Sequence, residues 1–94
     1  MEQPNKLLSN PIRLVVVSSL YQVASADFTA LMELTGASKG NLSVQLKKLQ
    51  EAEYIQIKKS FKDNYPNTRC SITSEGKSAF EKHVAYLKKV LRIT

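Results

Sequence analysis

The stretch of this sequence with the most potential for chemistry is SKGNLSVQLKK, residues 38–48, which combines lysines, amides and small polar residues. Asn and Gln amides can hydrogen-bond adenine, a serine hydroxyl suits several bases, and a valine can touch the thymine methyl group. Lysine ammonium groups bind phosphate or guanine, and the free N–H groups at the start of a helix favour a phosphate. The candidate DNA-binding residues of this stretch are Ser38, Lys39, Gly40, Asn41, Ser43, Val44, Gln45, Lys47 and Lys48.

A second group of candidates lies between residues 58 and 69. We expect Lys62 and Arg69 to contact the DNA backbone or the minor groove, and Thr68 to hydrogen-bond a phosphate. An ordinary strand residue is the alternative for Thr68. Lys58 and Lys59 stay open, because strand residues that point away from DNA have the same sequence signature.

The charge of the chain favours a polyanionic partner. Fourteen Lys and Arg residues stand against eight Asp and Glu residues, which gives a net charge of +6. Residues 39–69 hold seven of the basic and only three of the acidic residues. Charge alone does not separate nucleic-acid binding from an ordinary basic surface of solvated lysines, so the interpretation depends on where a fold places these residues.

Helix start and stop signals predict three helices in the first half of the chain. Asn10 before Pro11 begins a helix over residues 10–24, and Asp27 begins one over 27–35 that ends at Gly36. Ser38 then begins a helix over 38–52, with a tight glycine-containing turn before it. This is the spacing of a helix-turn-helix, and three leucines of the third helix share the face that should pack on the core: Leu42, Leu46 and Leu49.

Alternating residues predict a β-hairpin over residues 54–73, with Cys70 and Ile72 inward. We expect its connection, roughly residues 62–67, to be longer than a two-residue turn, to contain Pro66 and to project as a flexible flap. Thr73 or Ser74 should begin a last helix that runs to residue 91.

The last helix carries apolar residues at coiled-coil spacing, which favours a homodimer. The alternative is a helix that lies flat on its own domain. The candidate dimer residues are Phe80, Val84, Leu87, Val90 and Leu91.

The sequence does not contain the residues of a catalytic or metal site. His83 is the only histidine and Cys70 the only cysteine, and a packing role is favoured for each. The three glycines are isolated and form no phosphate-binding loop, so we expect no enzyme, metal or cofactor. The absence of a secretory signal pattern, of a long apolar run and of a cysteine pair favours a cytoplasmic protein without a membrane span.

Three pieces of the chain carry a family resemblance: NPIRL, DFTALMELTGASKGNLSVQLKKLQEAEYI and PNTRCSITSEGKSAF. In this order and spacing, from Asn10 to Leu91, the chain resembles the small MarR-like winged helix-turn-helix transcriptional regulators of bacteria and archaea. The resemblance implies a mostly α fold with a small β-hairpin wing (α+β) and a C-terminal helix for dimerisation. It also implies a homodimer on double-stranded DNA, with the third helix in the major groove and the wing on the backbone or minor groove, and it allows a small-molecule effector between the dimer helix and the DNA-binding part.

The chain departs from the family pattern at three places. Gln45 stands where relatives often have histidine, Glu53 stands where they usually have glycine, and FKDNYPNTR replaces their compact glycine-arginine turn. The alternative function is a winged-helix module that binds proteins and has lost DNA binding. The concentration of basic residues on the third helix and the wing argues against that alternative.

Overall fold

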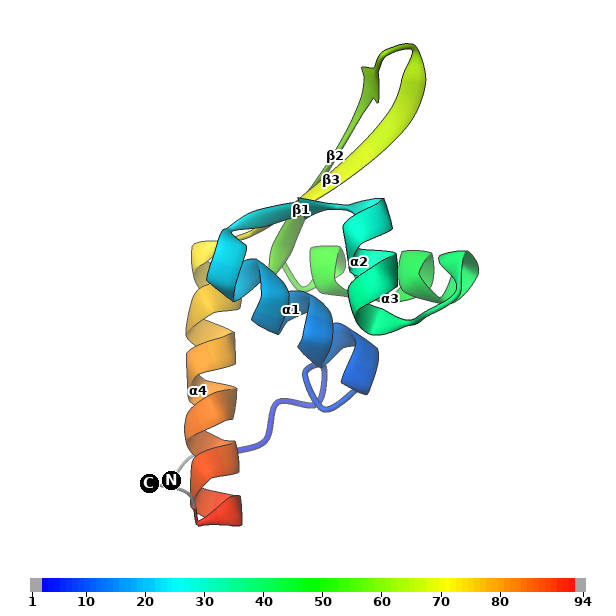
Figure 1. Ribbon diagram of the computed structural model, residues 1–94. Helices are drawn as coiled ribbons and strands as arrows, with labels where there is room; N and C mark the ends of the chain where they lie inside the picture. The colour runs from blue at the N-terminus through cyan, green and yellow to red at the C-terminus, as the bar shows by residue number, and fades with distance from the viewer. Residues whose placement is uncertain (1–2, 93–94) are drawn as a thin grey trace.

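The computed structural model describes residues 3–92 as a helical body from which a long β-hairpin projects (Figure 1). Its extents are 49 × 24 × 21 Å. The antiparallel sheet has the strand order β1-β3-β2. The arrangement confirms the winged helix fold. Its elements, in chain order, are α1 (Pro11–Val23), β1 (Ser25–Asp27), α2 (Phe28–Thr35), α3 (Lys39–Glu51), β2 (Ile55–Lys62), β3 (Tyr65–Ile72) and α4 (Ser74–Leu91).

Each of the four helices begins at a side chain that accepts a hydrogen bond from its first turn. Asn10 accepts from the Arg13 amide at 3.0 Å, and Thr73 accepts from the Gly76 amide at 2.9 Å. Asp27 and Ser38 do the same for α2 and α3. The sequence predicts the first three caps and leaves Thr73 and Ser74 open for α4, where the structure has Thr73. Each cap satisfies a backbone N–H that the helix itself leaves without a partner.

The core lies between α1, α3 and the base of the sheet. The three leucines of α3 face inward as predicted, and Cys70 of β3 is fully buried among them. The segment before α1 closes one end of this core. The buried apolar side chains are Leu8, Val16, Val17, Leu20, Leu31, Leu42, Leu46, Leu49, Ile55 and Cys70.

The end of α3 adopts a helix-terminating turn that normally contains glycine. Glu53 has a φ of +65°, its N–H donates to the Gln50 carbonyl, and the Tyr54 N–H donates to the Leu49 carbonyl. This 5→2 and 6→1 pattern is a Schellman motif. The helix therefore ends in the usual way for a glycine at this position, although a non-glycine residue, Glu53, occupies the left-handed position.

The prediction of a long, flexible wing loop is wrong. Asp63 and Asn64 alone connect the strands, with φ values of +53° and +67°, and Lys62 pairs directly with Tyr65. Two successive left-handed residues form the type I′ turn that matches the twist of a hairpin, and Asp and Asn are among the few side chains that tolerate it. Pro66 lies within β3, where β1 no longer pairs with that strand, so its missing N–H removes no ladder bond on that side.

Within residues 3–92, no helix is both long enough and apolar enough to cross a membrane.

Candidate nucleic-acid interface

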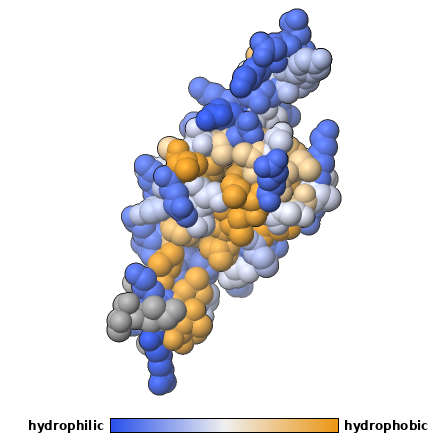
Figure 2. All heavy atoms as spheres, in the orientation of Figure 1, coloured by the Kyte–Doolittle hydropathy of each residue, from blue (hydrophilic) through white to orange (hydrophobic). Residues whose placement is uncertain are grey.

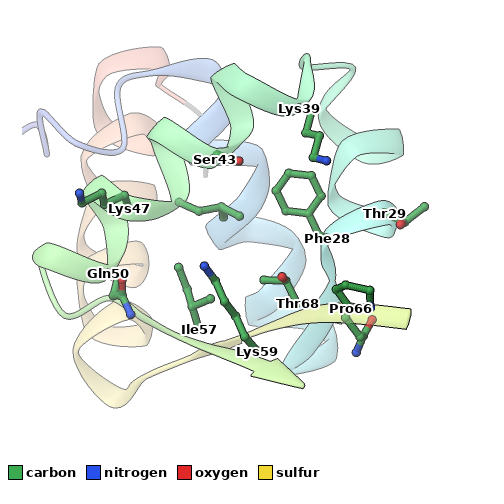
Figure 3. Close-up of a pocket in the computed structure, with 12 residues that line it drawn as sticks. Phe28, Thr29, Lys39, Ser43, Lys47, Gln50, Ile57, Lys59, Pro66 and Thr68 are labelled. Atoms are coloured by element: carbon green, nitrogen blue, oxygen red, sulfur yellow. The ribbon is translucent and has the colours of Figure 1, made fainter. Parts of the chain in front are cut away.

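A hollow of about 890 Å³ lies between α2, α3 and the strands of the wing (Figure 3). Lys39 and Lys47 border it from α3, and Lys59 borders it from β2. Half-buried Ile57 and buried Leu46 contribute apolar surface between these charges. The hollow thus presents three ammonium groups from two elements around an apolar floor. Its other lining residues are Phe28, Thr29, Ser43, Gln50, Pro66, Asn67 and Thr68.

Most candidates on α3 lie on its exposed face. Val44 is an exposed apolar side chain, and a Cβ built on Gly40 would meet no atom within 4 Å, so the backbone of the first turn is open to approach. The Ser38 hydroxyl accepts a hydrogen bond from the backbone N–H of Asn41 at 3.2 Å. The candidates that the structure leaves exposed are Ser38, Lys39, Gly40, Asn41, Ser43, Val44, Lys47 and Lys48.

Gln45 differs from the sequence expectation. Its side chain is only 8% exposed, accepts a hydrogen bond from the Arg13 guanidinium and donates one to Asn41 Oδ1 at 2.9 Å. Residue 45 lies three and four positions from Leu42 and Leu49, on the edge of the stripe that faces α1. We therefore correct the assignment of Gln45 as a base-contacting residue.

The wing separates its candidates onto two faces. Lys59 pairs with Thr68 in the strand register, and both line the hollow. Lys58 pairs with Arg69, and because strand residues alternate between faces, these two side chains and Lys62 point to the opposite face. The structure therefore brings Thr68 together with the lysines of α3, whereas Lys62 and Arg69 lie on the outer face of the hairpin.

Lys59 is the residue that sequence reasoning left open and the structure places in the hollow. The signal was present, because Lys59 lies two residues after Ile57 and must share the face that Ile57 turns toward α3. Phe61 and Tyr65 near the end of the wing were also missed, and they are 77% and 74% exposed. They place aromatic surface on the part of the hairpin that projects from the helical body (Figure 1).

His83 and Cys70 both have packing roles. Burial raises the pKa of the Cys70 thiol to about 11, so the thiol stays protonated and packs as an apolar group. His83 Nδ1 accepts a hydrogen bond from the Asn5 N–H at 3.2 Å, and its ring stacks on Tyr86. Burial lowers the pKa of His83, because the charged form loses solvation.

The predicted dimer residues become more exposed from the start of α4 to its end. Phe80 packs on the Tyr21 ring at 4.8 Å and on the domain's own core. Val84 and Leu87 are half-buried, and Val90 and Leu91 are 56% and 61% exposed. Apolar side chains extend over the middle of the molecule and along the lower part of α4 in Figure 2. The second half of α4 thus carries more apolar surface than its own domain covers.

The comparison with known families decides the identity of this fold. The family model described as the winged helix DNA-binding domain matches residues 12–91. The chain belongs to this family. The uncharacterized protein MJ0432 of Methanocaldococcus jannaschii is 30% identical to this winged helix DNA-binding domain over 79 residues, which are 84% of this chain and 86% of MJ0432.

Solved structures agree with the family. The transcriptional regulator homologue from Pyrococcus horikoshii OT3 superposes with a TM-score of 0.86 at 25% identity, over 94% of this chain and 87% of that one. BpsR of Bordetella bronchiseptica, whose DNA binding is regulated by 6-hydroxynicotinic acid, superposes with a TM-score of 0.77 at 13% identity, over 97% of this chain and 67% of that one. At that identity the second similarity shows the fold alone. The structural neighbours are MarR-like transcriptional regulators, and the resemblance to them is confirmed.

Proposed function

We propose that this winged helix DNA-binding domain is a sequence-specific transcriptional regulator that inserts α3 into the major groove of double-stranded DNA. The observation that carries the proposal is the exposed first half of α3 beside a hollow bordered by lysines. A major groove about 12 Å wide accepts one α-helix, and the residues near its N-terminus reach the base edges. Asn41, Ser43 and Val44 occupy that part of α3 and are exposed.

The two faces of the wing support two kinds of backbone contact. Lys59 and Thr68 line the same hollow as Lys47, so a phosphate strand that follows the rim of the groove can meet all three. Lys62 and Arg69 on the outer face would contact the neighbouring DNA backbone or the minor groove. Such contacts position the protein, and the base contacts of α3 specify the sequence.

We further propose that the functional unit is a homodimer formed through α4. The support is the exposed apolar surface of Val90 and Leu91, together with half-buried Val84 and Leu87 on the same helix. An 18-residue helix is about 27 Å long, long enough to pair beyond the helical body. A two-fold dimer presents two copies of α3, and these should meet half-sites about 34 Å apart.

We place a small-molecule effector in the groove of about 300 Å³ between α1 and α4. The support is chemical: the rings of Tyr21 and Phe80 suit an aromatic ligand, and the Lys88 ammonium group suits an acid. Glu81 also lines the groove, and its carboxylate accepts a hydrogen bond from the Tyr21 hydroxyl, so Lys88 is the lining residue that would pair with the acid. One structural neighbour, NadR, was solved in complex with 4-hydroxyphenylacetate, which is such a molecule.

Selection from randomised duplex DNA tests the proposal. We expect repeated selection to enrich an inverted repeat with half-sites about one helical turn apart, because a two-fold dimer reads the same bases twice. The purified protein should have twice the mass of one chain. Failure to enrich any sequence, with protein that is folded by circular dichroism, would contradict sequence-specific recognition.

A further inference from the structure

A directional chain of hydrogen bonds links α1 to the exposed face of α3. The Arg13 guanidinium donates to the Leu7 carbonyl at 2.6 Å through Nε, and to Gln45 Oε1 through Nη1. Gln45 Nε2 then donates to Asn41 Oδ1 at 2.9 Å. This series of hydrogen bonds begins at half-buried Arg13 and Leu7 and ends at exposed Asn41 in the first turn of α3.

The chemistry of arginine determines the direction of every bond in this chain. A guanidinium carries donors and no acceptor, so it can bond only the oxygen of the Gln45 carboxamide. The Gln45 NH₂ group then faces Asn41, and an NH₂ group bonds only an oxygen there. Gln45 is 8% exposed, which leaves little room for water to replace either partner. The orientation of both amides therefore follows from the identity of Arg13.

We infer that Arg13, acting through Gln45, presents Asn41 to DNA as a hydrogen-bond donor. The Asn41 oxygen is turned to Gln45, so its NH₂ group lies on the other side of the carboxamide, away from the Gln45 amide. Such a group bonds acceptor atoms: guanine O6 or N7, adenine N7, thymine O4, or a phosphate oxygen. Bidentate pairing with adenine needs an outward oxygen as well, so this inference corrects the expectation that Asn41 pairs with adenine. It rests on the proposed function, in which α3 enters the groove.

The variant Gln45→Glu tests the inference because it reverses the direction of the hydrogen bond between residues 45 and 41. The new carboxylate accepts from Arg13 and also accepts from the Asn41 NH₂, so the Asn41 oxygen turns outward. We expect about a tenfold loss of affinity for the wild-type DNA site. If Asn41 reads a base edge, the selected sequence changes at one position per half-site, from a base that offers an acceptor there, above all guanine with its O6 and N7, to cytosine or adenine, which offer an N–H donor. If Asn41 binds a phosphate, the loss is uniform and the selected sequence stays the same. Unchanged affinity with an unchanged selected sequence overturns the inference.

Two further variants separate orientation from folding and from charge. Asn41→Asp changes an exposed side chain, keeps an acceptor for Gln45 and removes the outward NH₂, so it should also lose affinity for the wild-type site. Gln22→Glu makes the same chemical change as Gln45→Glu on an exposed residue of α1, and it should leave the selected sequence unchanged. A loss of base preference in Gln22→Glu would assign the effect to charge and overturn the role of Gln45.

Side-chain amide NMR tests the orientation without DNA. In the wild type we expect slow hydrogen exchange for the Gln45 NH₂ group and exchange at the rate of free amides for the Asn41 NH₂ group. In Gln45→Glu the Asn41 NH₂ should become protected. Protection of the Asn41 NH₂ in the wild type would overturn the inference. If the NMR result is as expected but the wild type selects no DNA, the proposed function fails and DNA recognition by Asn41 fails with it.

Discussion

Gly76 of α4 lies directly against Tyr54, so that a Cβ at position 76 would stand 2.2 Å from the Tyr54 carbonyl oxygen. That oxygen accepts from the Thr73 N–H at 3.0 Å. The single proton of the Thr73 hydroxyl is shared between the Glu53 carbonyl oxygen at 2.6 Å and the Tyr54 carbonyl oxygen at 3.0 Å. The end of α3, the residue before β2 and the start of α4 are therefore joined at one point. This junction sets the orientation of α4 relative to α3.

Substitution of Gly76 by alanine should lower the free energy of unfolding by about 3 kcal/mol, because the added methyl group meets backbone that cannot move freely. Urea denaturation measures this change. Gly40→Ala is the matched control, since a Cβ there meets nothing within 4 Å and alanine favours a helix by about 1 kcal/mol. Equal losses in the two variants would contradict the close packing at Gly76.

Substitution of Glu53 by glycine should raise the free energy of unfolding by about 1 kcal/mol, because residue 53 has a left-handed φ of +65°. The neighbouring change Ala52→Gly is the control. Ala52 has a φ of −80°, so glycine relieves no strain there and should lower stability. Thermal or urea unfolding of both variants decides the point, and destabilisation by Glu53→Gly would show that the side chain contributes more than the backbone strain costs.

Replacement of both Val90 and Leu91 by serine should halve the mass measured by light scattering, because these side chains supply exposed apolar surface for the proposed dimer. Leu34→Ser on α2 changes an equally exposed leucine outside α4 and should leave the mass unchanged. A wild-type mass equal to one chain contradicts the dimer directly.

The stability of the protein should fall as the pH is lowered from about 7.5 to 5.5, the range in which an unperturbed histidine takes up its proton. Burial lowers the pKa of His83, so the unfolded chain binds this proton at a higher pH than the folded chain does. The stabilisation by neutral His83 is complete above the unfolded pKa and is lost as the pH falls through the folded pKa. Protonation also removes the Nδ1 acceptor from Asn5. In His83→Asn, which keeps an acceptor near that position, the slope between these pH values should disappear.

Features that depend on neighbours in sequence could be predicted from the sequence. The caps at Asn10, Asp27 and Ser38 and the inward leucines of α3 follow from local hydrogen bonding and helical period. The turn at Asp63 and Asn64 was missed because neither residue is glycine and because Pro66 suggested a loop rather than a strand with an unpaired edge.

The placement of Gln45 depends on a residue far away in the sequence. It is buried because Arg13, 32 positions earlier, supplies a charged donor for its oxygen. Helical period alone puts Gln45 at the border of the apolar stripe and does not decide which side it faces. Lys59 is different, since the alternation that begins at Ile57 was sufficient to place it in the hollow.

The measurement that tests the central claim most directly is the salt dependence of DNA binding, by fluorescence anisotropy on a duplex of about 30 base pairs between about 50 and 200 mM salt. Each phosphate contact contributes about 0.9 to the slope of log K against log salt, so Lys47→Ala/Lys48→Ala should flatten it by up to about 1.8. Lys88→Ala/Lys89→Ala on α4 removes the same charge away from the hollow and should leave the slope close to that of the wild type. Binding that is absent, or equally flattened in both double variants, would contradict DNA reading through α3.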